Sequence, residues 1–153
     1  MAGVETYALT LMKGVCKWTD WELSCATFYD GIFRNELKRQ NIKTVDLCET
    51  KNLKSMRKIS RYVNDNKINI VHMIDLKSTI VGGVCTIRMK GVKKIVTIHG
   101  LPELQIGTRK YIKYGLSIAA YFFILHTLID KVVYVSRDLS KKMEFILKKI
   151  SRS

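Results

Sequence analysis

Short apolar runs typical of buried strands alternate along this chain with stretches of helical periodicity, and this alternation limits the possible folds more than any other feature. The expected strands cover residues 21–28, 42–47, 68–74, 94–98 and 131–135. The expected helices cover residues 3–17, 32–39, 52–64, 76–89, 108–128 and 138–150. Strands separated by helices form βαβ units, so we predict an α/β fold with a Rossmann-like parallel sheet flanked by helices.

Chain length, hydrophobic content and net charge further limit the class of protein and its partners. The chain has 153 residues, enough for one domain with its own core, and we predict a single domain over residues 1–153. Hydrophobic residues make up 47% of the chain, which excludes intrinsic disorder. Lys and Arg outnumber Asp and Glu by 27 to 13, a net charge of +14. This charge favours a polyanionic partner, such as nucleic acid, an anionic membrane surface or a phosphorylated ligand, although solubility alone would also explain it.

Cysteine and histidine spacing argues against metal sites and disulfides. The four cysteines, at positions 16, 25, 48 and 85, contain no CxxC pair, and the histidines at 72, 99 and 126 have no metal-ligand spacing. We therefore expect no metal and no cofactor. The N-terminus lacks the basic and apolar regions of a signal peptide, which predicts a cytoplasmic protein with reduced thiols. Peripheral attachment to the inner face of the membrane is a second possibility.

Polar residues close three of the expected strands. Asp75 follows the third, His99 and Gly100 follow the fourth, and Ser136 and Arg137 follow the fifth. Ligands of parallel sheets bind at the carboxyl ends of strands, so these positions are the candidate site. His99 is the strongest candidate, because an imidazole there can donate a hydrogen bond to a ligand hydroxyl and the following glycine permits close approach.

Two apolar segments have more than one interpretation. The helix expected over residues 76–89 contains Gly82 and Gly83, each costing roughly 1 kcal/mol against alanine, which predicts a close approach to the sheet or to a ligand. Residues 114–129 are nearly all apolar but shorter than the ~20 residues of a transmembrane helix. We expect a buried crossover helix there, with a membrane-interface segment as the alternative. His126 in this helix, and His72 in the third strand, are expected to be structural.

Four segments resemble the acceptor-side half of family 4-type glycosyltransferases. Gly3-Val4-Glu5-Thr6 before a Leu-rich helix resembles the GGxE opening of that family. Ile70-Val71-His72 and Lys94-Ile95-Val96-Thr97-Ile98-His99-Gly100 resemble its two strand motifs that end in histidine. Asp130-Lys131-Val132-Val133-Tyr134-Val135-Ser136-Arg137-Asp138-Leu139 resembles its final strand and helix. The four segments follow the order of the family along nearly the whole chain.

The resemblance implies an incomplete GT-B N-terminal domain. Enzymes of this family have two Rossmann-like halves, of which the first binds the acceptor and the second binds a nucleotide sugar through a Glu-x7-Glu motif. No two glutamates of this chain have that spacing. Ala2 stands at the first glycine of the family motif, and the strand that precedes it in the family is not found. We therefore expect the donor half to come from a missing C-terminal domain or from a second chain.

The resemblance also implies roles for individual residues. His99 would be the catalytic residue, facing the transferred sugar, with Gly100 beside it. Gly3 at the start of the first helix would bind substrate, as would Glu103 in the loop after His99. Ser136 and Arg137 are the remaining substrate-binding candidates, and Ser136 is as well placed to cap the following helix.

These observations predict a glycosyltransferase half. The expected reaction moves sugar from a nucleotide sugar to a lipid-linked or saccharide acceptor, with retention at the anomeric carbon, and we expect little activity from this chain alone. A non-catalytic remnant that binds a membrane or a partner is one alternative. A basic nucleic-acid-binding protein is another, although the chain has no recognition-helix or RNA-recognition signature.

Overall fold

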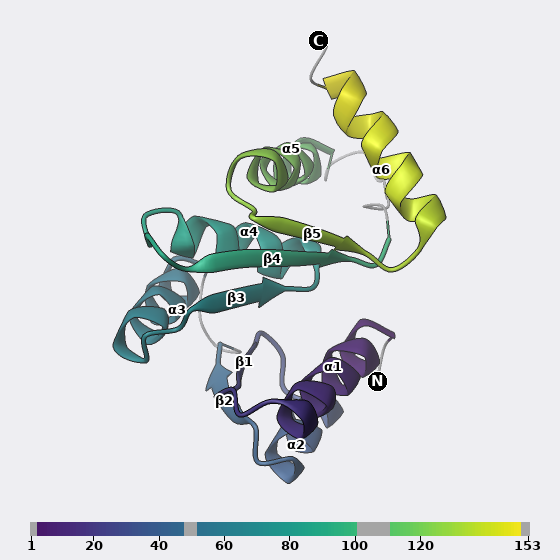
Figure 1. Ribbon diagram of the computed structural model, residues 1–153. Coiled ribbons are helices and arrows are strands. Elements are labelled where there is room, and N and C mark those ends of the chain that lie inside the picture. Colours follow the sequence, from purple (N-terminus) through teal and green to yellow (C-terminus); the bar gives the residue numbers. More distant parts are fainter. Residues whose placement is uncertain (1–2, 48–51, 101–110, 151–153) are drawn as a thin grey trace. The chain divides into compact units, whose positions relative to one another are not determined.

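The computed structural model describes residues 3–47, 52–100 and 111–150 (Figure 1). The chain divides into two compact units, residues 1–65 and residues 66–153, and each is described by itself. The expected single domain over residues 1–153 stays a prediction.

The first unit is built around one βαβ element. Its helices and strands are α1 (Gly3–Trp18), β1 (Ser24–Thr27), α2 (Ile32–Arg39), β2 (Lys43–Asp46) and α3 (Asn52–Asp65). Strands β1 and β2 pair in parallel, with Ser24 opposite Lys43, and α2 connects them. The core buries mainly aliphatic side chains, from α1, α2 and the β2 region: Ala8, Leu9, Met12, Leu37, Ile42, Val45 and Leu47.

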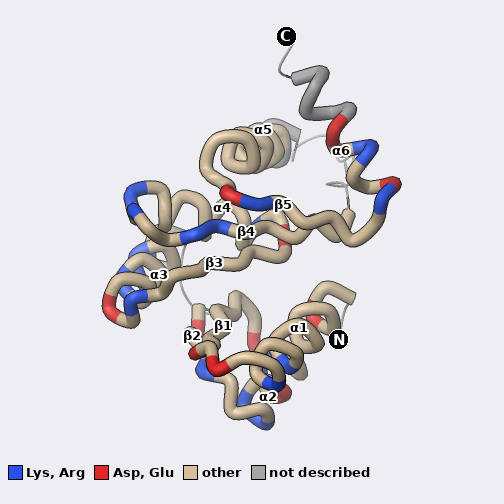
Figure 2. The backbone as a smooth tube through the Cα atoms, viewed as in Figure 1, with Lys and Arg blue, Asp and Glu red and all other residues tan. Residues whose placement is uncertain are grey.

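One face of α3 is basic. Lys54, Arg57, Lys58 and Arg61 follow one another at the spacing that places side chains on one side of a helix, and all four are exposed. Figure 2 shows this accumulation of blue along α3. The opposite side carries Val63, which is buried, so the helix is amphipathic with a cationic outer face.

The second unit is a three-stranded parallel sheet with helices after each strand. Its elements are β3 (Ile70–Met73), α4 (Leu76–Thr86), β4 (Lys93–Ile98), α5 (Tyr111–Thr127), β5 (Lys131–Tyr134) and α6 (Arg137–Ile150). The strand order is β3-β4-β5, so β4 is central. Ile70 pairs with Lys93, and Ile95 pairs with Lys131. All three arrows in Figure 1 point the same way, which places their carboxyl ends at one edge.

The core of the second unit joins the sheet to α5 and α6. It contains these buried side chains from β3, β4 and the two helices: Met73, Val96, Ile98, Tyr121, Leu125, Leu139 and Met143. Helix α5 is only partly buried, because Leu116 and Phe123 are 66% and 63% exposed. The expected buried crossover helix is therefore present, with one apolar face left open to solvent.

Helix α4 packs closely on both sides because of its glycine pair. A Cβ atom at Gly82 would lie 2.6 Å from Met73 Sδ on β3, and one at Gly83 would lie 2.6 Å from Ile124 Cγ2 on α5. Real Cβ atoms essentially never approach so closely, so any other residue at either position would force the neighbouring side chain to shift. The expected close approach of helix and sheet is thus confirmed.

The predicted α/β fold is confirmed, with parallel strands in open sheets flanked by helices, as in an incomplete Rossmann-like GT-B domain. Most differences between the expected and the observed helices and strands concern the residues at which they begin and end. The strand expected over 21–28 is limited to Ser24–Thr27, and the helix expected over 76–89 ends at Thr86. Gly91 then lies in the turn before β4, with a φ of 87° that favours glycine.

Substituting Gly83 by alanine tests this packing. Alanine gains roughly 1 kcal/mol of helix propensity, but overpacking against the β-branched Ile124 costs about 1–3 kcal/mol, so we expect net destabilisation of about 1 kcal/mol. Gly82→Ala should be milder, since Met73 is more flexible than isoleucine. Urea unfolding followed by circular dichroism measures both.

Gly115→Ala is the matched control. Gly115 lies in α5 of the same unit, and outside the backbone of its own helix none of the described residues has an atom within 4 Å of an added Cβ. This variant should gain stability, by up to about 1 kcal/mol. Equal stability changes at Gly83 and Gly115 would contradict the packing argument.

Candidate functional site

The carboxyl edge of the three-stranded sheet brings together most of the expected site residues. Asp75 follows β3, His99 and Gly100 follow β4, and Ser136 and Arg137 lie at the end of β5 and the start of α6. Because the strands are parallel and adjacent, these residues share one edge of one unit, as the sequence predicts.

His99 occupies the central position of this edge. It follows the last residue of the middle strand, Ile98, which is buried, while His99 itself is partly exposed. Gly100 is exposed, and none of the described residues has an atom within 4 Å of an added Cβ there. The Nε2 atom of His99 is buried, so the exposed part of this strand end is at Gly100.

His72 stands beside His99 and is fixed by the sheet. Its Nε2 lies 2.8 Å from Oγ1 of Thr97, a residue only 1% exposed on the neighbouring strand. Burial lowers the pKa of His72, and the nearby charge of His99 lowers it further. His72 is therefore the hydrogen-bonded structural histidine that the sequence predicts, and it favours a neutral imidazole next to the candidate site.

Two of the polar strand ends serve as helix caps. The Asp75 carboxylate accepts a hydrogen bond from the backbone N–H of Ser78, whose hydroxyl accepts from the Asp75 N–H in return, forming a capping box at α4. Ser136 Oγ accepts from the backbone N–H of Leu139 at 3.2 Å and caps α6 in the same way. Arg137 is exposed at the first position of α6.

Two tyrosines near this edge have raised pKa values that the sequence did not predict. Burial raises the pKa of Tyr121 to about 12, with smaller contributions from Tyr134 and Asp75. Burial, followed by the charge of Glu144, also raises the pKa of Tyr134. Both phenols therefore stay neutral at physiological pH. The sequence signal was weak, because Tyr121 lies within an apolar helix and looks like any other core aromatic residue.

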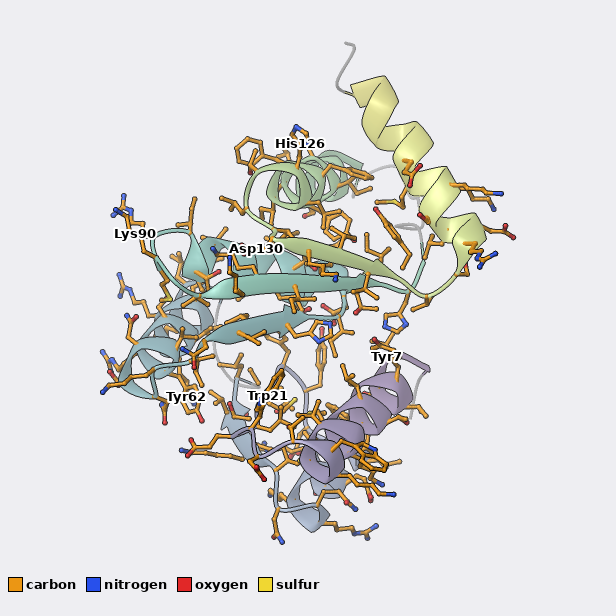
Figure 3. All side chains as sticks on the ribbon, viewed as in Figure 1. Tyr7, Trp21, Tyr62, Lys90, His126 and Asp130 are labelled. Atoms are coloured by element: carbon orange, nitrogen blue, oxygen red, sulfur yellow. The ribbon has the colours of Figure 1, made fainter. Side chains whose placement is uncertain are left out.

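The other expected site residues are not part of this edge as described. Gly3 is exposed at the first residue of α1, in the first unit, with nothing within 4 Å of an added Cβ. Glu103 lies outside the described residues. His126 is exposed on α5 and points away from the sheet (Figure 3), so it is not a core residue.

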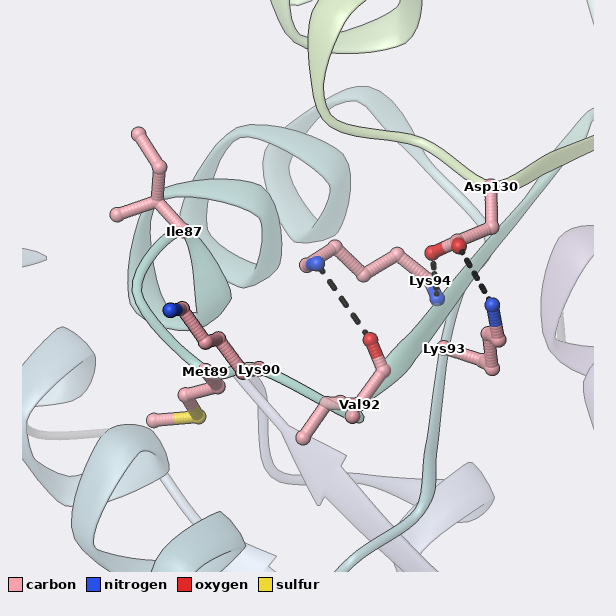
Figure 4. A pocket seen from close by; sticks show the side chains of 8 residues that line it. Ile87, Met89, Lys90, Val92, Lys93, Lys94 and Asp130 are labelled. Carbon is pink, nitrogen blue, oxygen red and sulfur yellow. Dashed lines mark hydrogen bonds and ion pairs between the residues drawn. The ribbon is translucent and has the colours of Figure 1, made fainter.

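A pocket lies at the opposite end of the sheet. It is open, has a volume of about 240 Å³, and is formed by the turn after α4, the start of β4 and Asp130 (Figure 4). Lys90, Lys93 and Lys94 line it. Since Lys93 is the first residue of β4 and His99 follows its last, the pocket and the candidate site are separate.

Two kinds of feature are absent from the described residues. No described helix combines the length and apolar character needed to cross a bilayer. In the same residues, no group of three or more His, Cys, Asp or Glu side chains is arranged to hold a metal ion.

A parallel α/β sheet with polar residues at the carboxyl ends of its strands places a ligand site where Rossmann-like domains have theirs. The family model described as "Glycosyl transferase 4-like" matches residues 15–129. The chain therefore belongs to the glycosyl transferase 4-like family, and its sequence is that of the N-terminal domain type. The match includes His99 and Gly100 but neither Gly3 nor Ser136. No curated protein and no solved structure matches the chain significantly.

The lowered pKa of His72 predicts a pH-dependent stability. The folded protein binds fewer protons than the unfolded chain below the ordinary histidine pKa of about 6.5. Stability should therefore be lost as the pH falls from about 6.5 through the lowered pKa. His72→Gln should weaken this dependence between about pH 7.5 and 5.5, as measured by thermal unfolding. His126→Gln is the control, and an equal effect of both variants would contradict the assignment.

Proposed function

We propose that the chain takes part in sugar transfer from a nucleotide sugar to an acceptor, with His99 next to the transferred sugar. The observation that carries this proposal is the place of His99 and Gly100 at the carboxyl end of the central strand, within a chain of the glycosyl transferase 4-like family. Family membership supports glycosyl transfer in general, and the exposed Gly100 beside His99 supports a sugar position at this strand end.

His99 would act on the sugar through hydrogen bonding. A neutral imidazole can donate to a sugar hydroxyl, and in the transition state this donor helps to stabilise the charge that develops at the ring. The neighbouring His72 is held by Thr97 at 2.8 Å, so it supports the position of the site without needing to contact the substrate. Retention at the anomeric carbon is the stereochemical outcome that we propose.

We propose that the donor is held by a second Rossmann-like half. The six glutamates of this chain lie at positions 5, 22, 36, 49, 103 and 144, and no two are separated by seven residues. The nucleotide sugar would then need side chains from beyond these 153 residues, either in the same polypeptide or in a partner. The chain's own part is the acceptor side.

The positive charge on α3 agrees with an acceptor at an anionic lipid surface. The exposed stripe of Lys54, Arg57, Lys58 and Arg61 on α3 provides four positive charges on one helix face. Such a face is attracted to anionic lipid headgroups by about 1 kcal/mol per basic residue near the surface. The proposed acceptor is therefore lipid-linked, with saccharide acceptors as the alternative that an acceptor panel would reveal.

Replacing His99 tests its role. His99→Ala should lower the rate of sugar transfer about 10²-fold, since one hydrogen-bond donor to the transition state is lost. Transfer is measured with labelled nucleotide sugars and membranes of the source cell, in an extract that supplies the donor half. His126→Ala, which changes an exposed histidine away from the sheet, should leave the rate unchanged.

An unchanged rate in His99→Ala would favour a non-catalytic binding protein. The purified chain is assayed in parallel. Sugar transfer by this chain without an added donor half would contradict the proposed division into a donor side and an acceptor side. The mass of the endogenous product distinguishes the two sources of the donor half. A species of about double the size points to one longer polypeptide.

A further inference from the structure

The lysine-lined pocket at the amino end of β4 has no part in the function proposed above. It is formed by the turn that connects α4 to β4, with Ile87, Met89 and Val92 as its apolar wall. Gly91 lies within this turn in the left-handed region, at a φ of 87°. The volume of about 240 Å³ is enough for a small polyatomic anion with its hydration water.

The charge of this pocket is unbalanced. Three lysines, at positions 90, 93 and 94, line it together with a single carboxylate, Asp130, which leaves a formal charge of 3 − 1 = +2. Like charges on neighbouring lysines repel one another, so an anion bound between them would be favoured.

The Asp130 carboxylate already pairs with Lys93 and with the backbone of Lys94. Its Oδ1 lies 3.2 Å from the Lys93 amino group, and its Oδ2 accepts a hydrogen bond of 2.9 Å from the backbone N–H of Lys94. These bonds lower the pKa of Asp130, which keeps the carboxylate ionised and in place. Asp130 thus pairs closely with Lys93 and fixes the start of β4, and the Lys94 amino group acts on it only through a weaker charge interaction.

The remaining two amino groups have weak or no local partners. Lys94 Nζ reaches the carbonyl oxygen of Val92 at a long distance of 3.4 Å. Lys90 is exposed and forms no ion pair with any carboxylate that the structure describes. Figure 4 shows the Lys93–Asp130 pair on one side, with the Lys90 and Lys94 side chains extending toward the other.

We propose that this pocket binds a phosphate group, with Lys90 and Lys94 as its direct ligands. Each ammonium group carries one positive charge and three N–H donors. The two ammonium groups together match the two negative charges of a phosphate monoester near neutral pH. The same chemistry is offered by a soluble phosphorylated molecule and by the phosphate of a lipid headgroup. The site is distinct from His99, which lies at the other end of β4.

Titration with inorganic phosphate tests the pocket directly. The intact chain is labelled with ¹⁵N and titrated at about pH 7.5, where the phosphate is mostly dianionic, with chloride holding the ionic strength constant. Saturable shifts of backbone amide signals are expected, centred on residues 87–94. Lys90→Gln/Lys94→Gln should weaken the apparent Kd about tenfold.

Lys141→Gln/Lys142→Gln is the matched control. These two lysines are exposed on α6 of the same unit, and the variant loses the same net charge. Its Kd should change less than about twofold, because distant surface charges are screened. Equal weakening by both pairs, or shifts centred elsewhere, would overturn the proposal. Lys90→Gln alone, at an exposed turn position, provides the same comparison if the double variant does not fold.

Vesicles then distinguish the source of the phosphate. Flotation is compared for phosphatidylcholine vesicles with and without phosphatidic acid, whose headgroup is a phosphate monoester. A loss of binding that is specific to the Lys90/Lys94 variant supports the pocket and assigns it to a lipid headgroup. Pocket-centred phosphate binding, together with equal vesicle binding of all variants, supports the pocket and assigns it to a soluble ligand.

Discussion

Contact between α4 and its two neighbours depends on the absence of side chains at Gly82 and Gly83, and the second unit is organised around this contact. Met73 of β3 lies against one glycine and Ile124 of α5 lies against the other. The glycine pair therefore fixes the distance from the sheet to α4 and from α4 to α5. Met73 also belongs to the core that supports β4, the strand that His99 follows.

Of the polar residues around His99, several have structural roles that hold the edge of the sheet in place. Asp75 and Ser136 use their side-chain oxygens to begin α4 and α6, and His72 is held by Thr97. These bonds keep the three strand ends in place. Gly100 is exposed beside His99, whose Nε2 is buried, and a rigid frame around the imidazole is what precise positioning of a substrate requires.

Local patterns predicted most of the fold, because apolar periodicity and helix signals depend on neighbours in the sequence. The five strands and six helices appear where alternation and helical spacing place them, and the glycine pair correctly indicated close packing. His99 and His72 were identified because strand ends meet at one edge of a parallel sheet. The neutral phenol of Tyr121 and the pairing of Asp130 with Lys93 were not predicted. They depend on burial and on contacts between distant segments, which no local pattern contains.

The sulfur of Met73 links this packing to oxidation chemistry. Met73 is only 2% exposed, and its Sδ lies so close over Gly82 that not even a methyl group fits between them. A sulfoxide adds a polar oxygen to the thioether, and the closed structure offers that oxygen no room on the Gly82 side. Oxidants would therefore reach this sulfur only when α4 separates from the sheet. The rate of sulfoxide formation at Met73 would report how often α4 separates from the sheet.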